Sequence, residues 1–229
     1  MKLLHVTDLH LNKNWYDWVA AHALDYDATC ISGDLLNLFG FDDVGNGAKS
    51  QIRWVRHWVA NFPSKLFLCS GNHDYFLTEE TDPFAEAEWF QAMRRKDVAV
   101  DNDTVDFKGW KFFCKPWVGG MPPQDERLIL LAHAPPEGLK VSDEGFGGGG
   151  DFEVSEIVAT LAPGSLVLSG HQHTPLAWHD VTIRGVHCFN PGYADPRKFH
   201  EPNRIVIDTE RMRASFHGWG EHCGEVSLA

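Results

Sequence analysis

The strongest constraint on the fold is a set of five short apolar segments, each about as long as a β-strand. They are rich in Leu, Ile and Val, with little alternation between apolar and polar residues. Strands of this kind are typically buried on both faces, as in the parallel sheets of α/β proteins. We therefore predict strands at residues 2–7, 28–32, 65–70, 128–133 and 165–170.

Amphipathic segments lie between these apolar runs. Residues 15–24 and 50–61 each place apolar side chains on one helical face, and residues 83–95 form a third segment of helical character. Asp82 can cap that third helix, and Pro83 suits its first position. The alternation of strand and helix predicts an α/β fold.

Two stretches depart from this rhythm. Residues 97–117 alternate with a period of two around residues 101–103, and residues 180–217 contain hairpin patterns with turn candidates at Arg184-Gly185 and Glu210-Arg211. We therefore expect a second, more antiparallel sheet. A chain of 229 residues fits one large domain or two small ones. Because we find no linker long enough to mark a boundary, we expect a single domain over residues 1–229.

Polar side chains follow each of the five apolar runs at the point where the run ends. In parallel sheets, ligands bind outside the carboxyl ends of the strands. We therefore expect these carboxylate, imidazole and carboxamide groups to meet at one edge. In chain order they are Asp8 and His10, Asp34, Asn72 with His73 and Asp74, His133, and finally His171 with His173.

The spacing and chemistry of these residues indicate a metal centre. Asp8 and His10 are two residues apart, as are His171 and His173, and in extended backbone such pairs point to the same side. Gly33 and Gly71 permit a tight turn and a close approach of the backbone. Imidazoles mixed with oxygen donors suit Mn, Fe, Zn or Ni. Counted without His73 and Asp74, seven of these residues are candidate ligands. One ion does not need seven ligands, whereas two ions that share a carboxylate would use them all.

Several of these residues also have a purely structural interpretation, in which they bind no metal. His133 by itself would more often be a core residue, and only the other strand ends favour a ligand. Asn72 could simply favour a turn. For Asp74, a contact to a ligand residue and a helix cap are equally open. Trp117 and Trp178 lie near strand ends, where core packing is favoured over the lining of a pocket.

Taken in order, these motifs resemble those of the calcineurin-like metallophosphoesterases. The resemblance extends from residue 1 to about residue 192 and rests on Asp8-x-His10, Gly33-Asp34, Gly71-Asn72-His73-Asp74, His133 and Gly170-His171-x-His173. It implies a four-layer αββα fold, a two-sheet sandwich flanked by helices. One metal would be held by Asp8, His10 and His173, and the other by Asn72, His133 and His171. Asp34 would bridge the two ions.

The same resemblance implies the chemistry. A hydroxide that bridges two divalent ions, with manganese favoured and Fe, Zn or Ni as alternatives, would attack the phosphorus in line. His73 would not bind metal but would face the substrate phosphate and protonate the leaving oxygen. The catalytic residues would therefore be His73 and Asp34.

The chain departs from the protein Ser/Thr phosphatases of the superfamily, which carry an Arg shortly after the Gly-Asp motif. Here the sequence reads GDLLNLFG, with Asn37 and no arginine nearby. HAPPEGL at residues 133–139 and NPG at 190–192 look more like the small bacterial phosphoesterases. We expect hydrolysis of small phosphodiesters, with a phosphomonoesterase as the alternative. A non-catalytic metal-binding scaffold is less favoured, because all seven candidates and His73 are retained.

Composition limits the partners. The net charge is −12, with a pI near 5.4, so we expect a small phosphorylated substrate and not a nucleic-acid polymer. We find no signal peptide and no segment of membrane-spanning length. Five scattered cysteines without a C-x-x-C motif favour a reducing cytoplasm. The sequence predicts neither the physiological substrate nor the oligomeric state.

One segment has a biased composition, the glycine-rich residues 143–153, DEGFGGGGDFE. It lacks the Lys-Ser/Thr ending of a phosphate-binding P-loop. We therefore predict a mobile loop beside the site, followed by a helix from about Asp151.

Overall fold

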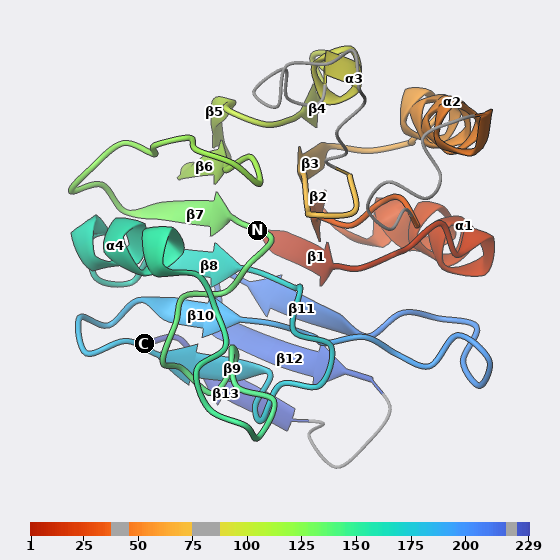
Figure 1. The fold of residues 1–229 in the computed structure, drawn as a ribbon. Coiled ribbons are helices and arrows are strands. Elements are labelled where there is room, and N and C mark those ends of the chain that lie inside the picture. The colour runs from red at the N-terminus through yellow and green to blue at the C-terminus, as the bar shows by residue number, and fades with distance from the viewer. Residues whose placement is uncertain (38–45, 75–87, 219–223) are drawn as a thin grey trace.

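The computed structural model describes residues 1–37, 46–74, 88–218 and 224–229. Two β-sheets face each other, and helices cover their outer faces (Figure 1). This is the predicted α/β arrangement of a two-sheet sandwich flanked by helices. The predicted Asp82 cap and Pro83 start lie outside the described residues.

The first sheet has seven strands in the order β13-β12-β11-β1-β2-β3-β4. One half is parallel and contains β1 (Lys2–Val6), β2 (Ala28–Ser32), β3 (Leu66–Cys69) and β4 (Val98–Ala99). The other half is antiparallel and contains β11 (Arg204–Asp208), β12 (Arg213–His217) and β13 (Gly224–Ser227).

The second sheet has six strands in the order β5-β6-β7-β8-β10-β9. Its inner pairs are parallel and only its two edge pairs are antiparallel. The strands are β5 (Thr104–Phe107), β6 (Trp110–Cys114), β7 (Leu128–Leu131), β8 (Leu166–Leu168), β9 (His179–Val181) and β10 (His187–Phe189).

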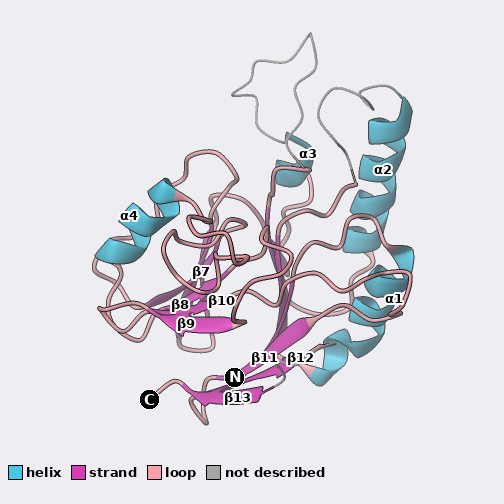
Figure 2. Ribbon diagram, turned by 60° about the horizontal axis from the view of Figure 1, so that its bottom comes forward, coloured by secondary structure: helices cyan, strands magenta, loops and turns pink. Residues whose placement is uncertain are grey.

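Helices complete the outer layers. The first sheet is covered by α1 (Lys13–His22), the short 3₁₀ turn η1 (Ala23–Asp25), α2 (Asn46–Ala60) and α3 (Glu88–Gln91), and the second by α4 (Phe152–Thr160). Figure 2 shows α4 on one side of the molecule and α1 and α2 on the other. Asp151 caps α4, because its Oδ1 accepts a hydrogen bond of 2.9 Å from the Val154 amide.

Three apolar layers explain why the strands are apolar on both faces. In β1, Leu4 and Val6 pack in the cluster that contains α1 and α2, whereas Leu3 points into the cluster between the sheets. In β7, Leu128 and Leu130 pack in the cluster that contains α4. Successive side chains of a strand point to opposite faces, so a strand between two such layers has no polar face.

Our prediction of which segments form a second, more antiparallel sheet was wrong. The five apolar strands are divided between the sheets, with β1, β2 and β3 in the first and β7 and β8 in the second. The hairpin of β11 and β12, with its turn at Glu210-Arg211, joins the first sheet. Residues 101–103 connect β4 of one sheet to β5 of the other, and the turn between paired strands β5 and β6 is at residues 108–109.

Candidate metal centre

The segments that follow β1, β2, β3, β7 and β8 bring all seven predicted ligand residues together, although these strands belong to two sheets. Contacts between the segments connect the sheets directly. The His171 amide donates to Asp8 Oδ2 over 3.1 Å, and His133 Nδ1 lies 2.7 Å from the Ser32 carbonyl. The predicted meeting of strand ends is therefore present, built across a sandwich instead of along one sheet edge.

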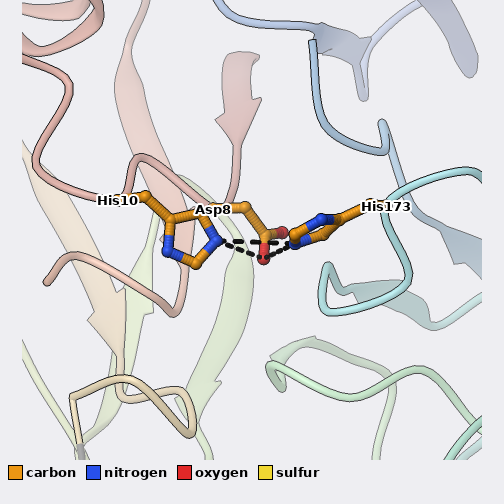
Figure 3. A group of neighbouring side chains, drawn as sticks. All are labelled: Asp8, His10 and His173. Carbon is orange, nitrogen blue, oxygen red and sulfur yellow. Dashed lines mark hydrogen bonds and ion pairs between the residues drawn. The ribbon is translucent and has the colours of Figure 1, made fainter. Parts of the chain in front are cut away.

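The first group of donors consists of Asp8, His10 and His173 (Figure 3). Asp8 Oδ1 lies 3.6 Å from His10 Nε2 and 3.4 Å from His173 Nε2, and the two imidazole nitrogens are 3.4 Å apart. The other oxygen of Asp8 is fixed by the Thr7 hydroxyl at 2.7 Å and the His171 amide at 3.1 Å. Oδ1 is buried and accepts no hydrogen bond from the described residues.

An unpartnered buried carboxylate oxygen is costly in a protein interior. Here it faces two imidazole nitrogens that can offer lone pairs, and a divalent cation at this position would be bound by all three atoms. The donor set of Asp8, His10 and His173 therefore fits a metal ion.

The second group of donors consists of Asn72, His133 and His171. Asn72 Oδ1 lies 3.1 Å from His133 Nε2 and 3.0 Å from His171 Nδ1. The other nitrogen of His133, Nδ1, is 2.7 Å from the Ser32 carbonyl, to which it can donate. That contact fixes the ring orientation and turns Nε2 toward the group, where it can offer a lone pair to a cation once its proton is lost.

Asp34 lies between the two groups. Its Oδ2 is 3.2 Å from His133 Nε2 in the second group and 3.7 Å from His10 Nε2 in the first. Its Oδ1 accepts a hydrogen bond of 2.9 Å from the His73 amide. One buried carboxylate thus faces donors of both groups while its second oxygen is held by the backbone.

The backbone at the centre is left-handed at four of the seven candidates. The φ angles are 51° at Asp8, 41° at His10, 53° at Asp34 and 67° at His171. Our expectation of extended backbone at the Asp8–His10 and His171–His173 pairs was therefore wrong. β1 ends at Val6, and the chain then turns so that His10 reaches Asp34. Non-glycine residues with positive φ are uncommon and cluster at functional sites.

Two glycines allow the close packing of the centre. A Cβ on Gly33 would lie 2.6 Å from Cγ of His133, and one on Gly71 would lie 2.6 Å from the Asp34 amide nitrogen. Both distances are far below van der Waals contact, so the predicted close approach of the backbone is present at both positions.

His73 and Asp74 lie next to the segment that carries Asp34. The Nε2 of His73 is 3.8 Å from Asp34 Oδ2, and its ring contacts the His10 ring edge-on at 4.6 Å between centroids. The buried Asp74 carboxylate accepts hydrogen bonds from the amides of Leu35 at 3.2 Å, Leu36 at 2.9 Å and Gly71 at 3.0 Å. Asp74 therefore shapes the loops that carry Asp34 and Asn72.

The electrostatics favour ionised carboxylates at the centre. Burial would raise the pKa of Asp8, but His10, His173 and His133 outweigh it and hold that pKa well below its ordinary value. Burial opposes ionisation of Asp34 too, and His133 lowers its pKa. Burial works against the charge of His133, yet Asp34 raises its pKa to about 9. The carboxylates are therefore charged at neutral pH and ready for a cation in place of the imidazole protons.

Sequence reasoning missed three residues that support the centre. The Tyr193 ring stacks on His173, with centroids 4.7 Å apart and an interplanar angle of 24°. Asn190 Nδ2 lies 3.0 Å from each of three carbonyl oxygens, those of Val141, Gly170 and Gln172. Thr7 donates to Asp8. Trp117, expected in the core, lies beside the site, with its ring 5.6 Å from His133 and 5.4 Å from His171.

The glycine-rich residues 143–150 reach this region from the His173 side. Glu144 Oε1 accepts hydrogen bonds from the amide of Thr174 at 2.8 Å and from its hydroxyl at 3.2 Å. Phe146, within the glycines, is 96% exposed. The segment is thus anchored beside His173, and its mobility stays a prediction.

Comparison with known proteins gives one family and several similar folds. The family model described as calcineurin-like phosphoesterase matches residues 1–175. The structure of an archaeal phosphodiesterase superposes with a TM-score of 0.54 at 16% identity, over 96% of this chain and 100% of that chain. The structure of Yfce, a phosphoesterase from E. coli, superposes with a TM-score of 0.50 at 17% identity, over 100% of both chains. No curated protein matches the chain.

Proposed function

Because the chain belongs to the calcineurin-like phosphoesterases and is therefore a hydrolase of phosphate esters, we propose that it cleaves small phosphodiesters at a centre of two divalent ions. The observation that carries this proposal is the position of Asp34 Oδ2, between His133 of one donor group and His10 of the other. A carboxylate so placed is suited to bridge two ions.

We assign the ligands by the two donor groups. Asp8, His10 and His173 would hold one ion, Asn72, His133 and His171 would hold the other, and Asp34 would contact both. Imidazole, carboxylate and amide donors suit manganese, with iron, zinc or nickel as alternatives. Free thiols take no part, since Cys30, Cys69, Cys114 and Cys188 are buried elsewhere in the described residues.

Bound ions would neutralise the phosphoryl oxygens and lower the pKa of a coordinated water, so that hydroxide is available at neutral pH. The chain itself supplies orientation and a proton. Thr7 and the His171 amide fix Asp8, the Ser32 carbonyl fixes His133, and the His73 amide fixes Asp34. Each of these contacts holds a donor atom in place before substrate arrives.

His73 is assigned the proton transfer to the leaving oxygen. Burial holds the pKa of His73 below its ordinary value, although the negative charge of Asp34 opposes this effect. A phosphate anion beside the ring would favour the protonated form, and that form can then donate to the departing oxygen.

Preference for a diester follows from the charges around the site. Within the described residues, no hydrogen bond or ion pair joins a Lys or Arg side chain to any candidate ligand. Arg197, the cation nearest in sequence to Tyr193, pairs with Asp195 at 3.0 Å and is exposed. A diester has a single negative charge on its phosphoryl group and needs fewer cationic contacts than a monoester dianion. One solved neighbour is itself a phosphodiesterase.

We also propose that residues 1–229 act as one domain, because the candidate ligands come from both sheets. We further propose that the protein is located in a reducing cytoplasm, because the thiols of the described part of the chain are buried and unpaired. None of the described helices has the length and apolarity needed to span a membrane.

The test compares bis-p-nitrophenyl phosphate with p-nitrophenyl phosphate in the presence of Mn²⁺, together with metal analysis after dialysis. We expect the diester to be cleaved faster and about two ions per chain to be retained. Asp34→Ala should lose both ions and activity, whereas Asp106→Ala, at an exposed carboxylate on β5, should keep both. A much faster monoester reaction would point to a phosphomonoesterase, and full metal occupancy in Asp34→Ala would refute the bridging assignment.

A further inference from the structure

A cavity of about 270 Å³ is lined by His173, whose Nε2 lies 3.4 Å from Asp8 Oδ1 in the first donor group. His173 and Tyr193 form the wall that it shares with the candidate centre, and their rings are stacked. We propose that this cavity binds the ester group that stays on phosphorus, and that this group is an uncharged, ring-bearing alcohol of the nucleoside class. The inference rests on the proposed phosphodiesterase function and names the substrate class for it.

The lining of the cavity sets the chemistry of its occupant. Leu176, Trp178, Tyr193 and Phe216 supply apolar and aromatic surface. None of the described residues that line it is Asp, Glu, Lys or Arg. Leu176 is 48% exposed, so apolar surface remains for a ligand to cover. Ligand sites are mostly apolar and aromatic with a few polar groups, and aromatic rings stack on other planar rings. The aromatic lining therefore favours a planar ring, and the lack of charged side chains among the described lining residues favours an uncharged one.

The size of the cavity limits the occupant to part of a substrate. Pockets that hold whole small-molecule ligands typically measure about 300–1,000 Å³. A cavity of about 270 Å³ is just below that range, and the phosphate itself would lie outside it, at the centre. The space therefore suits a single ring-bearing ester group.

The order of the rings decides which ester group enters. His73 contacts His10 at 4.6 Å between centroids, and His10 contacts both His173 and Tyr193 at 5.4 Å. His10 therefore lies between His73, the proposed proton donor to the leaving oxygen, and the stacked pair of His173 and Tyr193 that lines the cavity. With the leaving group near His73, the group retained on phosphorus is directed toward Tyr193 and the cavity.

The test uses two diesters with the same leaving group, the p-nitrophenyl ester of thymidine 5′-phosphate and methyl p-nitrophenyl phosphate. Because the leaving group is shared, a difference in kcat/KM reports the retained group. We expect the full-length Mn²⁺ enzyme to prefer the thymidine ester by at least about tenfold, mainly through KM. Leu176→Ser should reduce that preference about fivefold, because it removes roughly half of the free energy gained by burying a leucine side chain. The matched control Ile183→Ser, at a fully exposed side chain of the β9–β10 turn, should not change it.

A binding measurement separates this inference from the proposed function. Thymidine carries no phosphate, so ligand-observed NMR with the chelator-treated protein reports the cavity without catalysis. We expect binding to the wild type and to Ile183→Ser, and weaker binding to Leu176→Ser. Equal hydrolysis of the two esters without thymidine binding would overturn the cavity assignment and leave the phosphodiesterase intact. Thymidine binding that weakens in Leu176→Ser, without hydrolysis of either ester, would support the cavity and overturn the proposed function.

Discussion

Gly33→Ala is the substitution that most directly tests whether close packing of backbone and imidazole builds the centre. Gly33 has a φ of 88°, and an added Cβ would lie 2.6 Å from Cγ and 2.8 Å from Cβ of His133. The left-handed backbone alone costs about 1–2 kcal/mol for a residue with a side chain. To restore ordinary contact of about 3.5–4.0 Å, the ring must also move by about 1 Å.

The His133 ring cannot move by that amount without losing its partners. It is buried, its Nδ1 is 2.7 Å from the Ser32 carbonyl, and its Nε2 is 3.2 Å from Asp34 Oδ2. Overpacking of this kind typically costs about 1–3 kcal/mol beyond the backbone term. A displacement of about 1 Å in a catalytic site can reduce activity about 100-fold. We therefore expect weaker Mn²⁺ binding and a loss of that order in diester hydrolysis.

Gly109→Ala is the matched control. Gly109 has a similar φ of 80°, but an added Cβ there meets nothing within 4 Å. Urea unfolding of the chelator-treated variants should show the backbone cost in both and the additional cost only in Gly33→Ala. Calorimetric titration with Mn²⁺ and diester hydrolysis should be unchanged in Gly109→Ala. Equal stability of the two variants, with full metal affinity in Gly33→Ala, would refute the reasoning.

Other measurements test the remaining parts of the site. His73→Ala should lose about 10²–10⁴-fold on an alkyl diester and much less on a p-nitrophenyl ester, with unchanged metal content; equal losses would assign His73 to phosphate binding. Asn190→Ala should lower the free energy of unfolding by about 1–3 kcal/mol and weaken Mn²⁺ binding, because it frees the carbonyls of the segment carrying His171 and His173; unaltered thermal melting would contradict this. Asp151→Ala should lower the free energy of unfolding by about 1 kcal/mol, because it removes the cap of α4; thermal melting measures this loss, with Asp106→Ala as the control. Backbone amides of residues 145–150 should exchange hydrogen quickly without ligand and slowly with phosphate, whereas slow exchange in both states would mean a fixed turn.

The positions of the candidate ligands could be predicted because each follows an apolar strand. Asp34 and His133 carry no distinguishing pattern individually, and their shared position after buried strands revealed that they would meet. The assignment of strands to sheets could not be predicted in the same way. Strands β1 and β7 lie in different sheets, but each is covered by apolar layers on both faces, so their sequences have the same character.

The details that sequence could not predict depend on contacts between distant residues. The left-handed backbone at Asp8 and His10 is held by hydrogen bonds from their amides to the Gly33 and Asp34 carbonyls, of 3.2 and 3.0 Å. Tyr193 became part of the site by stacking on a ring 20 residues earlier, and no spacing rule marks such a pair. The NPG motif at residues 190–192 was the available signal, since Asn190 anchors the segment that carries His171 and His173.

The pairing of β1 has a consequence for biosynthesis. One edge of β1 pairs with β2, where Leu3 is opposite Ala28, and the other pairs with β11, where Leu3 is opposite Ile207. At about 5–20 residues per second, roughly 10–40 s separate the emergence of these two partners from a ribosome. During that interval β1 presents an unpaired apolar edge, which is a template for intermolecular association. Nascent chains interrupted between residues 173 and 204 should therefore depend on chaperones and aggregate without them, although they already contain every candidate metal ligand.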